Sequence, residues 1–178
     1  AGVVVGASVS ATDYNFPELR RPALSGFVYI DVNANNVRNA GTDLAVAGAT
    51  VRLLNANTLA VIATTTTDAS GAYSFANLDP LTPYVLEEPL PATPTNLSNG
   101  PVNPGLIGGV ACASGCTAQP DAPAAGTDRI AAIDLSSGAD GTQFNFGEIQ
   151  LSRVAGTVWV DTNRNGVLDA SEATRLQG

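Results

Sequence analysis

The sequence predicts an all-β protein built as a two-layer β-sandwich, and three observations carry this prediction. Short apolar runs alternate with turn signals rich in Gly, Asn, Asp and Pro. No window sustains the 3.6-residue apolar period of an amphipathic helix, so helix is expected only as a turn around Ala170–Arg175. Aromatic residues stand at alternate positions, as Tyr73 and Phe75 do, which places them on one face of a strand.

The expected strands follow one another along the chain. Leu24–Ile30 is the first, and Ala49–Leu54 with Leu59–Thr66 predicts a hairpin around Asn55–Asn57. A turn at Asp68–Gly71 should come next. Further strands are expected at Ala72–Ala76, Pro83–Glu88, Ile130–Leu135, Thr142–Phe146 and Val154–Val160.

Residues 89–128 differ from the rest of the chain. They are rich in Pro, Gly, Ala and Asn and contain both cysteines, so the sequence predicts one long excursion between two strands. Long loops of this kind either decorate a surface or carry function. Both interpretations stay open at this point.

The chain matches itself when its numbering is shifted by 130. The segment FNFGEIQLSRVAGTVWVDTNRNGV, from Phe144, aligns without a gap with YNFPELRRPALSGFVYIDVNANNV, from Tyr14. A fixed period of about 130 residues indicates a tandem array. We therefore expect residues 1–22 to be the last strands of one repeat, 23–150 to be a complete sandwich, and 151–178 to hold the first strand and loop of the next.

The stretch DTNRNGVLDASE at residues 161–172 has the ligand spacing of an EF-hand-type calcium loop. Gly166 stands at position 6 of the loop, where the chain must turn sharply. Carboxylate, amide and backbone oxygens at the other positions would surround the ion. The predicted Ca²⁺ ligands are Asp161, Asn163, Asn165, the carbonyl of Val167, Asp169 and Glu172.

The equivalent stretch at residues 31–43, DVNANNVRNAGTD, is less complete. Asn36 replaces the glycine, and Thr42 stands where Glu172 closes the later loop. Asp43, one residue further on, is the candidate substitute for the missing carboxylate. Fewer anionic ligands predict weaker binding, and the alternative for both loops is an Asx-rich turn without a metal. The predicted ligands here are Asp31, Asn33, Asn35, Val37, Asn39 and Asp43.

Composition narrows the function classes. The formal net charge of −8 argues against nucleic-acid binding, and no apolar run approaches a membrane span. The chain contains neither His nor Lys, so the common catalytic base and nucleophile pairings are missing and an enzyme is not expected. Glu87 and Glu88 are neighbours in an expected strand, so their side chains face opposite sides rather than one acid–base site.

Cys112 and Cys116 are the two cysteines of the chain. With no His present, a zinc site would have too few ligands, and the CxxxC spacing differs from that of CxxC redox pairs. We predict a small disulfide loop that contributes about 2 kcal/mol through chain entropy. Such a bond should shape a surface excursion rather than hold the domain together, and it indicates an oxidising, extracellular compartment.

Several motifs together resemble a known family. SGFVYIDVNANNV, AGATVRLL, TTDASGAYSFANL, PYVLEEPLP and FNFGE occur in this order, and Asp68, Gly71, Tyr73 and Phe75 carry a D-x-x-G-x-Y-x-F turn. With the DxNxNGxxDxxE loop, the pattern is similar to the SdrD B-like repeat of serine-aspartate-repeat surface proteins, within the collagen-adhesin B-type group. The resemblance implies an immunoglobulin-like or transthyretin-like sandwich, calcium binding, and tandem stalk modules at the cell surface.

Two features depart from the pattern of the family. Some relatives lock their sandwich with a Lys–Asn isopeptide bond promoted by a buried acid, and Glu88 falls near the position of that acid. This chain has no Lys, so the bond cannot form, and Ca²⁺ is the expected remaining cross-link. The glycine of the family's P-G-x-Y motif is also absent, since the run here is Pro80-Leu-Thr-Pro83-Tyr84.

These observations favour a calcium-binding structural repeat of an exported bacterial surface protein or extracellular fibre, in which Ca²⁺ stiffens a stalk or filament. Its expected partners are neighbouring copies of the same repeat, in a tandem array or a homopolymeric fibre. The alternative is a ligand-binding adhesin module that contacts a host or matrix ligand through residues 89–128. Aromatic residues are scarce in that segment, which counts against a binding hot spot.

Overall fold

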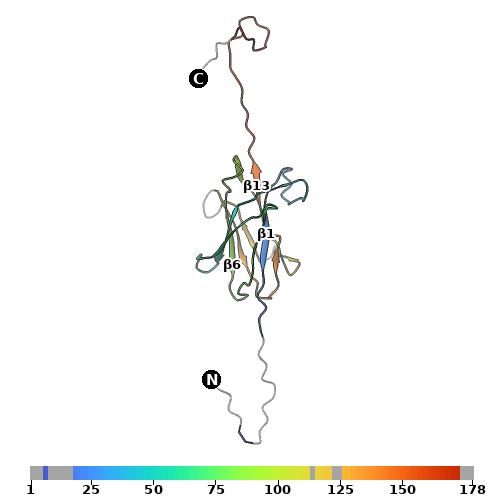
Figure 1. The fold of residues 1–178 in the computed structure, drawn as a ribbon, viewed down its shortest axis with the longest axis vertical. Coiled ribbons are helices and arrows are strands. Elements are labelled where there is room, and N and C mark those ends of the chain that lie inside the picture. Colours follow the sequence, from blue (N-terminus) through green and yellow to red (C-terminus); the bar gives the residue numbers. More distant parts are fainter. Residues whose placement is uncertain (1–5, 8–17, 113–114, 122–125, 173–178) are drawn as a thin grey trace.

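The computed structural model describes residues 6–7, 18–112, 115–121 and 126–172, and it confirms the two-sheet β-sandwich. The strands of the sandwich lie within residues 24–150, and residues 151–172 extend away from it (Figure 1). All regular elements in the described part of the chain are strands. That part contains no helix with the length and apolar character needed to cross a bilayer.

The larger sheet is organised around β1 (Leu24–Ile30), which lies in its centre. β1 runs parallel to the late strands β12 and β13 and antiparallel to the early strands β2 and β5. The other members of this sheet are β2 (Leu44–Ala45), β5 (Ala72–Phe75), β7 (Leu97–Asn103), β8 (Leu106–Ile107), β9 (Val110–Ala111), β12 (Gly141–Thr142) and β13 (Asn145–Gln150).

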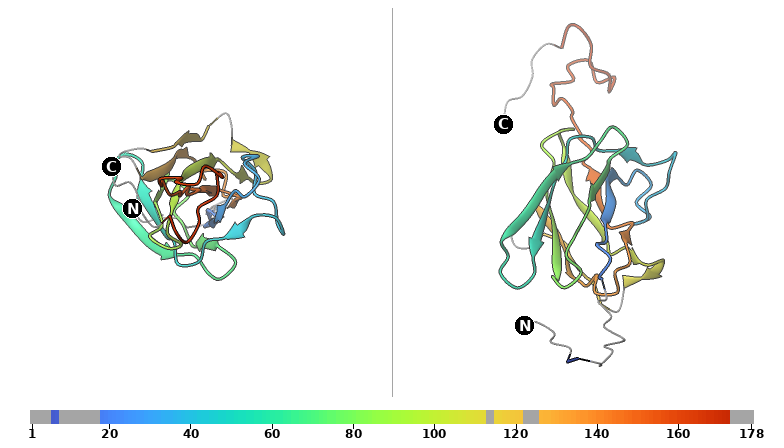
Figure 2. Two further views of the ribbon diagram at one scale, coloured as in Figure 1. Left: turned by 90° about the horizontal axis from the view of Figure 1, so that it is seen from above. Right: turned by 60° about the horizontal axis from the view of Figure 1, so that its bottom comes forward.

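The smaller sheet is entirely antiparallel and has the order β10-β11-β6-β3-β4. In the right-hand view of Figure 2, the β3–β4 hairpin lies on the opposite side of the sandwich from the short β8–β9 hairpin. Its strands are β3 (Thr50–Asn55), β4 (Val61–Thr66), β6 (Tyr84–Pro89), β10 (Thr117–Gln119) and β11 (Thr127–Ile133).

The core lies between the two sheets and is filled by side chains from both. Tyr73 and Phe75 are buried at alternate positions of β5, as the sequence predicts. The hydroxyl of Tyr73 donates to the carbonyl of Phe144 at 2.7 Å, so its one polar group is satisfied. Phe146 packs near the Tyr73 ring, with ring centroids 6.4 Å apart.

Gly71 explains why the turn before β5 needs a glycine. Its φ angle is +75°, and a Cβ atom at this position would lie 2.4 Å from the carbonyl oxygen of Val28. The turn therefore needs both left-handed backbone and the absence of a side chain.

The chain enters and leaves the sandwich at opposite ends, because β1 and β13 are parallel neighbours. Residues 18–23 join the sandwich at one end, which we call the N-terminal end (Figure 1). The segment after β13 leaves at the other, the C-terminal end.

The sequence predicted most early strands closely and several late ones poorly. β1 matches its predicted limits, and the hairpin of β3 and β4 is confirmed. Residues 89–128 are not one excursion, since they contain β7 to β10 and the start of β11, which pair within the two sheets. The final strand runs over Asn145–Gln150 rather than Thr142–Phe146.

Two further predictions concern the C-terminal segment, namely a strand at Val154–Val160 and a helical turn around Ala170–Arg175. The strand expected at Val154–Val160 is absent, since this segment joins neither sheet and has a single bridge residue at Trp159. The helical turn expected around Ala170–Arg175 lies mostly outside the described residues, which end at Glu172.

The disulfide between Cys112 and Cys116 is confirmed. Both cysteines are buried and belong to the hydrophobic core cluster. The expectation that this bond only trims a surface excursion is therefore wrong, because the β8–β9 region packs the pair against the sandwich.

Candidate calcium-binding loops

The loop at residues 161–172 is organised by its own acidic and amide side chains. The two carboxylate oxygens of Asp161 accept the backbone N–H groups of Asn165 (3.1 Å) and Gly166 (2.9 Å). Gly166 has a φ angle of +74°, so the sharp turn predicted at position 6 is present. The N–H of Gly166 is also the main reason why the pKa of Asp161 lies below its usual value.

Amide side chains at positions 3 and 5 converge on the carboxylate at position 9. The side-chain NH₂ groups of Asn163 and Asn165 both donate to Asp169 Oδ2, at 2.7 and 2.8 Å. Their amide oxygens accept the N–H groups of Asn165 and Val167, which fixes two successive Asx turns.

Glu172 closes this loop from position 12. One of its oxygens accepts the N–H of Thr162 at 2.8 Å, and the other accepts the N–H of Asp169 at 3.3 Å. The Glu172 side chain is buried, with 2% of the residue exposed. Its carboxylate therefore spans the loop from position 2 to position 9.

The loop at residues 31–43 repeats most of this hydrogen-bond scaffold. Asp31 accepts the N–H groups of Asn35 (3.2 Å) and Asn36 (2.8 Å), and the NH₂ groups of Asn33 and Asn35 converge on Asn39 Oδ1. Asn36 takes a φ angle of +63° at position 6, which asparagine tolerates better than most residues.

Asp43 occupies the structural place of Glu172. Its two oxygens accept the N–H of Val32 at 3.2 Å and the N–H of Asn39 at 2.6 Å. After a shift of 130 residues, these partners correspond to Thr162 and Asp169, two of the three residues whose backbone N–H groups donate to Glu172. A shorter acid placed one residue later thus makes the same two backbone contacts, which agrees with its predicted role as the substitute.

The donor set of both loops suits a hard cation. Carboxylate and amide oxygens and a backbone carbonyl are the ligands that Ca²⁺ prefers, and the amide oxygen at position 5 of each loop keeps a second lone pair beyond its backbone hydrogen bond. Among the described residues, no group of three or more His, Cys, Asp or Glu side chains is arranged to hold a metal ion. A cation in these loops would therefore depend on the asparagine and backbone oxygens as well as on the carboxylates.

The earlier loop is anchored to the C-terminal end of the sandwich. The N–H of Asp31 donates to the carbonyl of Glu148 on β13 at 2.9 Å. The Arg38 guanidinium lies 3.6 Å from the centroid of the Phe27 ring, a cation–π contact with β1. The junction nearest to this loop is therefore the one where the chain leaves the domain.

Comparison with known proteins finds a matching family profile and similar relatives. The sequence profile of the SdrD B-like domain matches residues 23–105. Serine-aspartate repeat-containing protein D of Staphylococcus aureus strain Newman is 31% identical over 172 residues, which is 96% of this chain and 12% of that protein. The proteins of the same name from strains MW2 and USA300 are also 31% identical and are covered over 11% of their length.

The chain is therefore similar to the SdrD B-like domain family over residues 23–105. It spans about an eighth of the length of the relatives named above. The immunoglobulin-like or transthyretin-like sandwich that the sequence resemblance implies is the fold observed.

Inside the sandwich, two glutamates meet between the sheets. Glu88 on β6 belongs to the smaller sheet and Glu148 on β13 to the larger one, and neither has any exposed surface. Each carboxyl group influences the pKa of the other. Within the described part of the chain, all four of their carboxyl oxygens are buried without a hydrogen-bond partner.

Burial and the negative charges of neighbouring carboxylates raise the pKa values of both glutamates. Burial, followed by the charges of Glu148 and Asp128, raises the pKa of Glu88 to about 10. Burial, followed by the charge of Asp128, raises the pKa of Glu148 to about 8. Asp128 is fully buried beside them, and burial raises its pKa too, although it accepts bonds from Asn99 Nδ2 and the N–H of Asp121.

Glu87, the neighbour of Glu88, faces the outer side of the smaller sheet. It forms ion pairs with Arg52 and Arg129 at 2.9 Å from each. Burial acts to raise the pKa of Glu87, but the two arginines hold it below its usual value. The predicted opposite orientation of these two glutamates is correct, and it could have located Glu88 in the core. The sequence did not predict that Glu148 and Asp128 are buried, because the expected strands 142–146 and 130–135 exclude both residues. In the structure, Glu148 lies on β13 and Asp128 on β11.

Proposed function

We propose that this chain is a calcium-binding structural repeat module of an exported bacterial surface protein, and that Ca²⁺ stiffens the stalk or filament to which it belongs. The observation that carries the proposal is the shared scaffold of the two acidic loops, in which Asp43 and Glu172 close their loops through equivalent backbone bonds. A conserved hydrogen-bond frame is what a loop needs to present its oxygens to one ion.

The path of the chain supports a role as a spacer. A module that the chain enters at one end and leaves at the other adds its full length to an array (Figure 1). The internal match supports a division into a preceding repeat (1–22), a complete repeat (23–150) and a following repeat (151–178). The disulfide supports a location outside the cytoplasm.

Binding is tested first by calorimetric titration of the chain with Ca²⁺, followed by thermal melts in excess Ca²⁺ and in excess chelator. At a free concentration about a hundred times the dissociation constant, binding to the folded state alone adds about 2.7 kcal/mol. This corresponds to an increase of roughly 5–10 °C in the melting midpoint. The absence of both a binding heat and a shift would reject the calcium assignment.

Stiffening is tested separately by small-angle scattering from a chain of several repeats. We expect a larger maximum dimension with Ca²⁺ than with chelator, because filled loops fix the backbone beside each junction. Equal dimensions would reject stiffening, even if the titration shows that calcium binds.

A further inference from the structure

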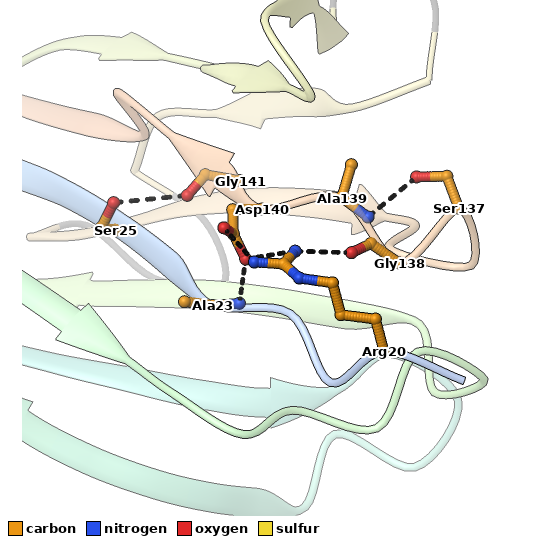
Figure 3. Close-up of polar contacts among 8 residues, drawn as sticks. All are labelled: Arg20, Ala23, Ser25, Ser137, Gly138, Ala139, Asp140 and Gly141. Carbon is orange, nitrogen blue, oxygen red and sulfur yellow. Dashed lines mark hydrogen bonds and ion pairs between the residues drawn. The ribbon is translucent and has the colours of Figure 1, made fainter. Parts of the chain in front are cut away.

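Residues 20–23 are fastened to the N-terminal end of the sandwich (Figure 3). The Arg20 guanidinium donates to both carboxylate oxygens of Asp140, at 3.0 and 2.7 Å, and to the carbonyl of Gly138 at 2.7 Å. Asp140 also accepts the N–H of Ala23 at 2.8 Å. The carbonyl of Pro22 accepts the N–H of Leu78 at 3.0 Å. Backbone hydrogen bonds therefore hold the incoming chain to its domain from Pro22 onward.

The outgoing chain is hydrogen-bonded to the C-terminal end of the sandwich up to Leu151. Gln150, the last residue of β13, is paired with Leu97. One residue later, the N–H of Leu151 donates to the carbonyl of Asn96 at 2.8 Å. Leu151 is thus still held by the domain that the chain is leaving.

The internal repeat places these two attachments on consecutive residues. With the shift of 130, Pro22 corresponds to Ser152. In a tandem array, Leu151 would be held by the repeat behind it and Ser152 by the repeat ahead. Consecutive Cα atoms across a trans peptide are about 3.8 Å apart, so no free linker residue remains between the domains. The ends of two successive sandwiches must then touch.

Both ends carry exposed apolar side chains at the place of contact. Val32 and Leu44 are 55% and 54% exposed at the C-terminal end, on either side of the acidic loop. At the N-terminal end, Leu81 is 72% exposed in the turn before β6. Beside that turn lies a depression of about 310 Å³, lined by Leu19 and Pro80 together with the charged Glu18, Arg21 and Asp79.

We propose that successive repeats abut directly, with Val32 and Leu44 of one repeat packed against the Pro80–Leu81 turn of the next. The partner of this surface is a further copy of the domain in the same chain, so the inference rests on the tandem part of the proposed function. Asp43 holds the N–H of Val32 and directly precedes Leu44. The acidic loop consequently positions the two side chains that make the contact.

The test uses a tandem chain in which residues 1–153 of one copy continue into residues 24–178 of a second. This junction keeps the natural residues 148–153, in which Gln150 takes the place of Arg20, so the second copy is held through its backbone bonds and not through the Arg20–Asp140 ion pair. The exposed Thr64 is changed to Cys in each copy and spin-labelled, while the natural cysteines remain in their disulfide. Pulsed electron resonance then measures the distribution of distances between the two domains.

We expect one narrow distance peak, which Leu44→Ser in the first copy or Leu81→Ser in the second copy broadens. The matched controls are the same substitutions in the other copy, where no complete repeat faces them, and they should leave the peak narrow. A Gly-Ser-Gly-Ser insertion after Leu151 supplies the distribution of a loose linker. The proposal would be overturned if the distance distribution of the unsubstituted tandem chain were as broad as that of the insertion variant. It would also be overturned if the junction substitutions gave the same distance distributions as their controls.

Calorimetry on the same tandem chain separates this inference from the calcium assignment. A narrow distance peak in a chain that binds no Ca²⁺ would support the interface and reject calcium binding. Calcium binding together with a broad distance peak would support the calcium assignment and reject the interface.

Discussion

The buried pair Glu88–Glu148 predicts that this domain loses stability as the pH rises from mildly acidic to mildly alkaline values. Both carboxyl groups have raised pKa values in the folded state, about 10 and about 8, against 4.5 as the ordinary value. Below pH 4.5 the carboxyls are protonated in both folded and unfolded chains, and their stabilising contribution is complete. Above it the unfolded chain releases two protons that the folded domain keeps, so the free energy of unfolding falls until the pH passes the folded pKa values.

The slope follows from the number of protons retained. Each proton changes the free energy of unfolding by about 1.4 kcal/mol per pH unit, so the pair predicts a loss of about 3 kcal/mol per unit between roughly pH 5.5 and 7.5. Asp128, whose pKa burial also raises, acts in the same direction. For a domain with an unfolding free energy of about 5–15 kcal/mol, this dependence is large.

Glu148→Gln tests this account because it keeps a hydrogen-bonding group beside Glu88 and removes one titrating proton. Urea unfolding followed by circular dichroism, at several pH values in chelator, should show the slope reduced by about half. The control is Glu87→Gln on the outer face. The ion pairs of Glu87 hold its pKa below the usual value, so its contribution is present above pH 4.5 and is lost as the pH falls. This control should therefore lower stability across the range without changing the slope between pH 5.5 and 7.5. An unchanged slope in Glu148→Gln would refute the account in which each of the two glutamates retains a proton.

Three further predictions concern the turn, the disulfide and the first loop. Gly71→Ala should cost about 3 kcal/mol or more in urea unfolding, because its Cβ would lie 2.4 Å from a backbone oxygen, whereas Gly48→Ala, at the same φ of +75° but with open space, should cost about 1 kcal/mol. Reducing the Cys112–Cys116 bond with a thiol should lower the unfolding free energy by about 2 kcal/mol and leave the domain folded, and loss of the circular dichroism signal of the folded state would contradict this. Asp43→Asn should weaken Ca²⁺ binding by the first loop about tenfold in calorimetry, while Thr42→Asn should not, and equal effects of the two would show that Asp43 does not close the loop.

Local patterns in the sequence were sufficient for the early strands and the loop chemistry. The Asp, Asn and Gly spacing at residues 161–172 predicted a turn that side chains within the loop organise, and the structure has that turn. Gly71 and the alternation of Tyr73 and Phe75 likewise act over a few neighbouring residues, so a linear pattern could reveal them. The internal match of 130 residues could also be read without coordinates.

Only the tertiary structure decided how distant segments meet. Residues 89–128 looked like a loop because Pro and Gly mask strand propensity, yet pairing with β13 and β11 turns much of the segment into sheet. The same holds for Glu88 and Glu148, since a carboxyl group meets another across the core only when β6 and β13 face each other in different sheets. The equivalence of Asp43 and Glu172 depends on shared backbone partners rather than on sequence position, because an acid shorter by one methylene must start from the next residue. Turns and strands that depend on a few neighbouring residues could therefore be predicted from the sequence. Contacts between residues far apart in the chain could not, because they depend on how the two sheets pack against each other.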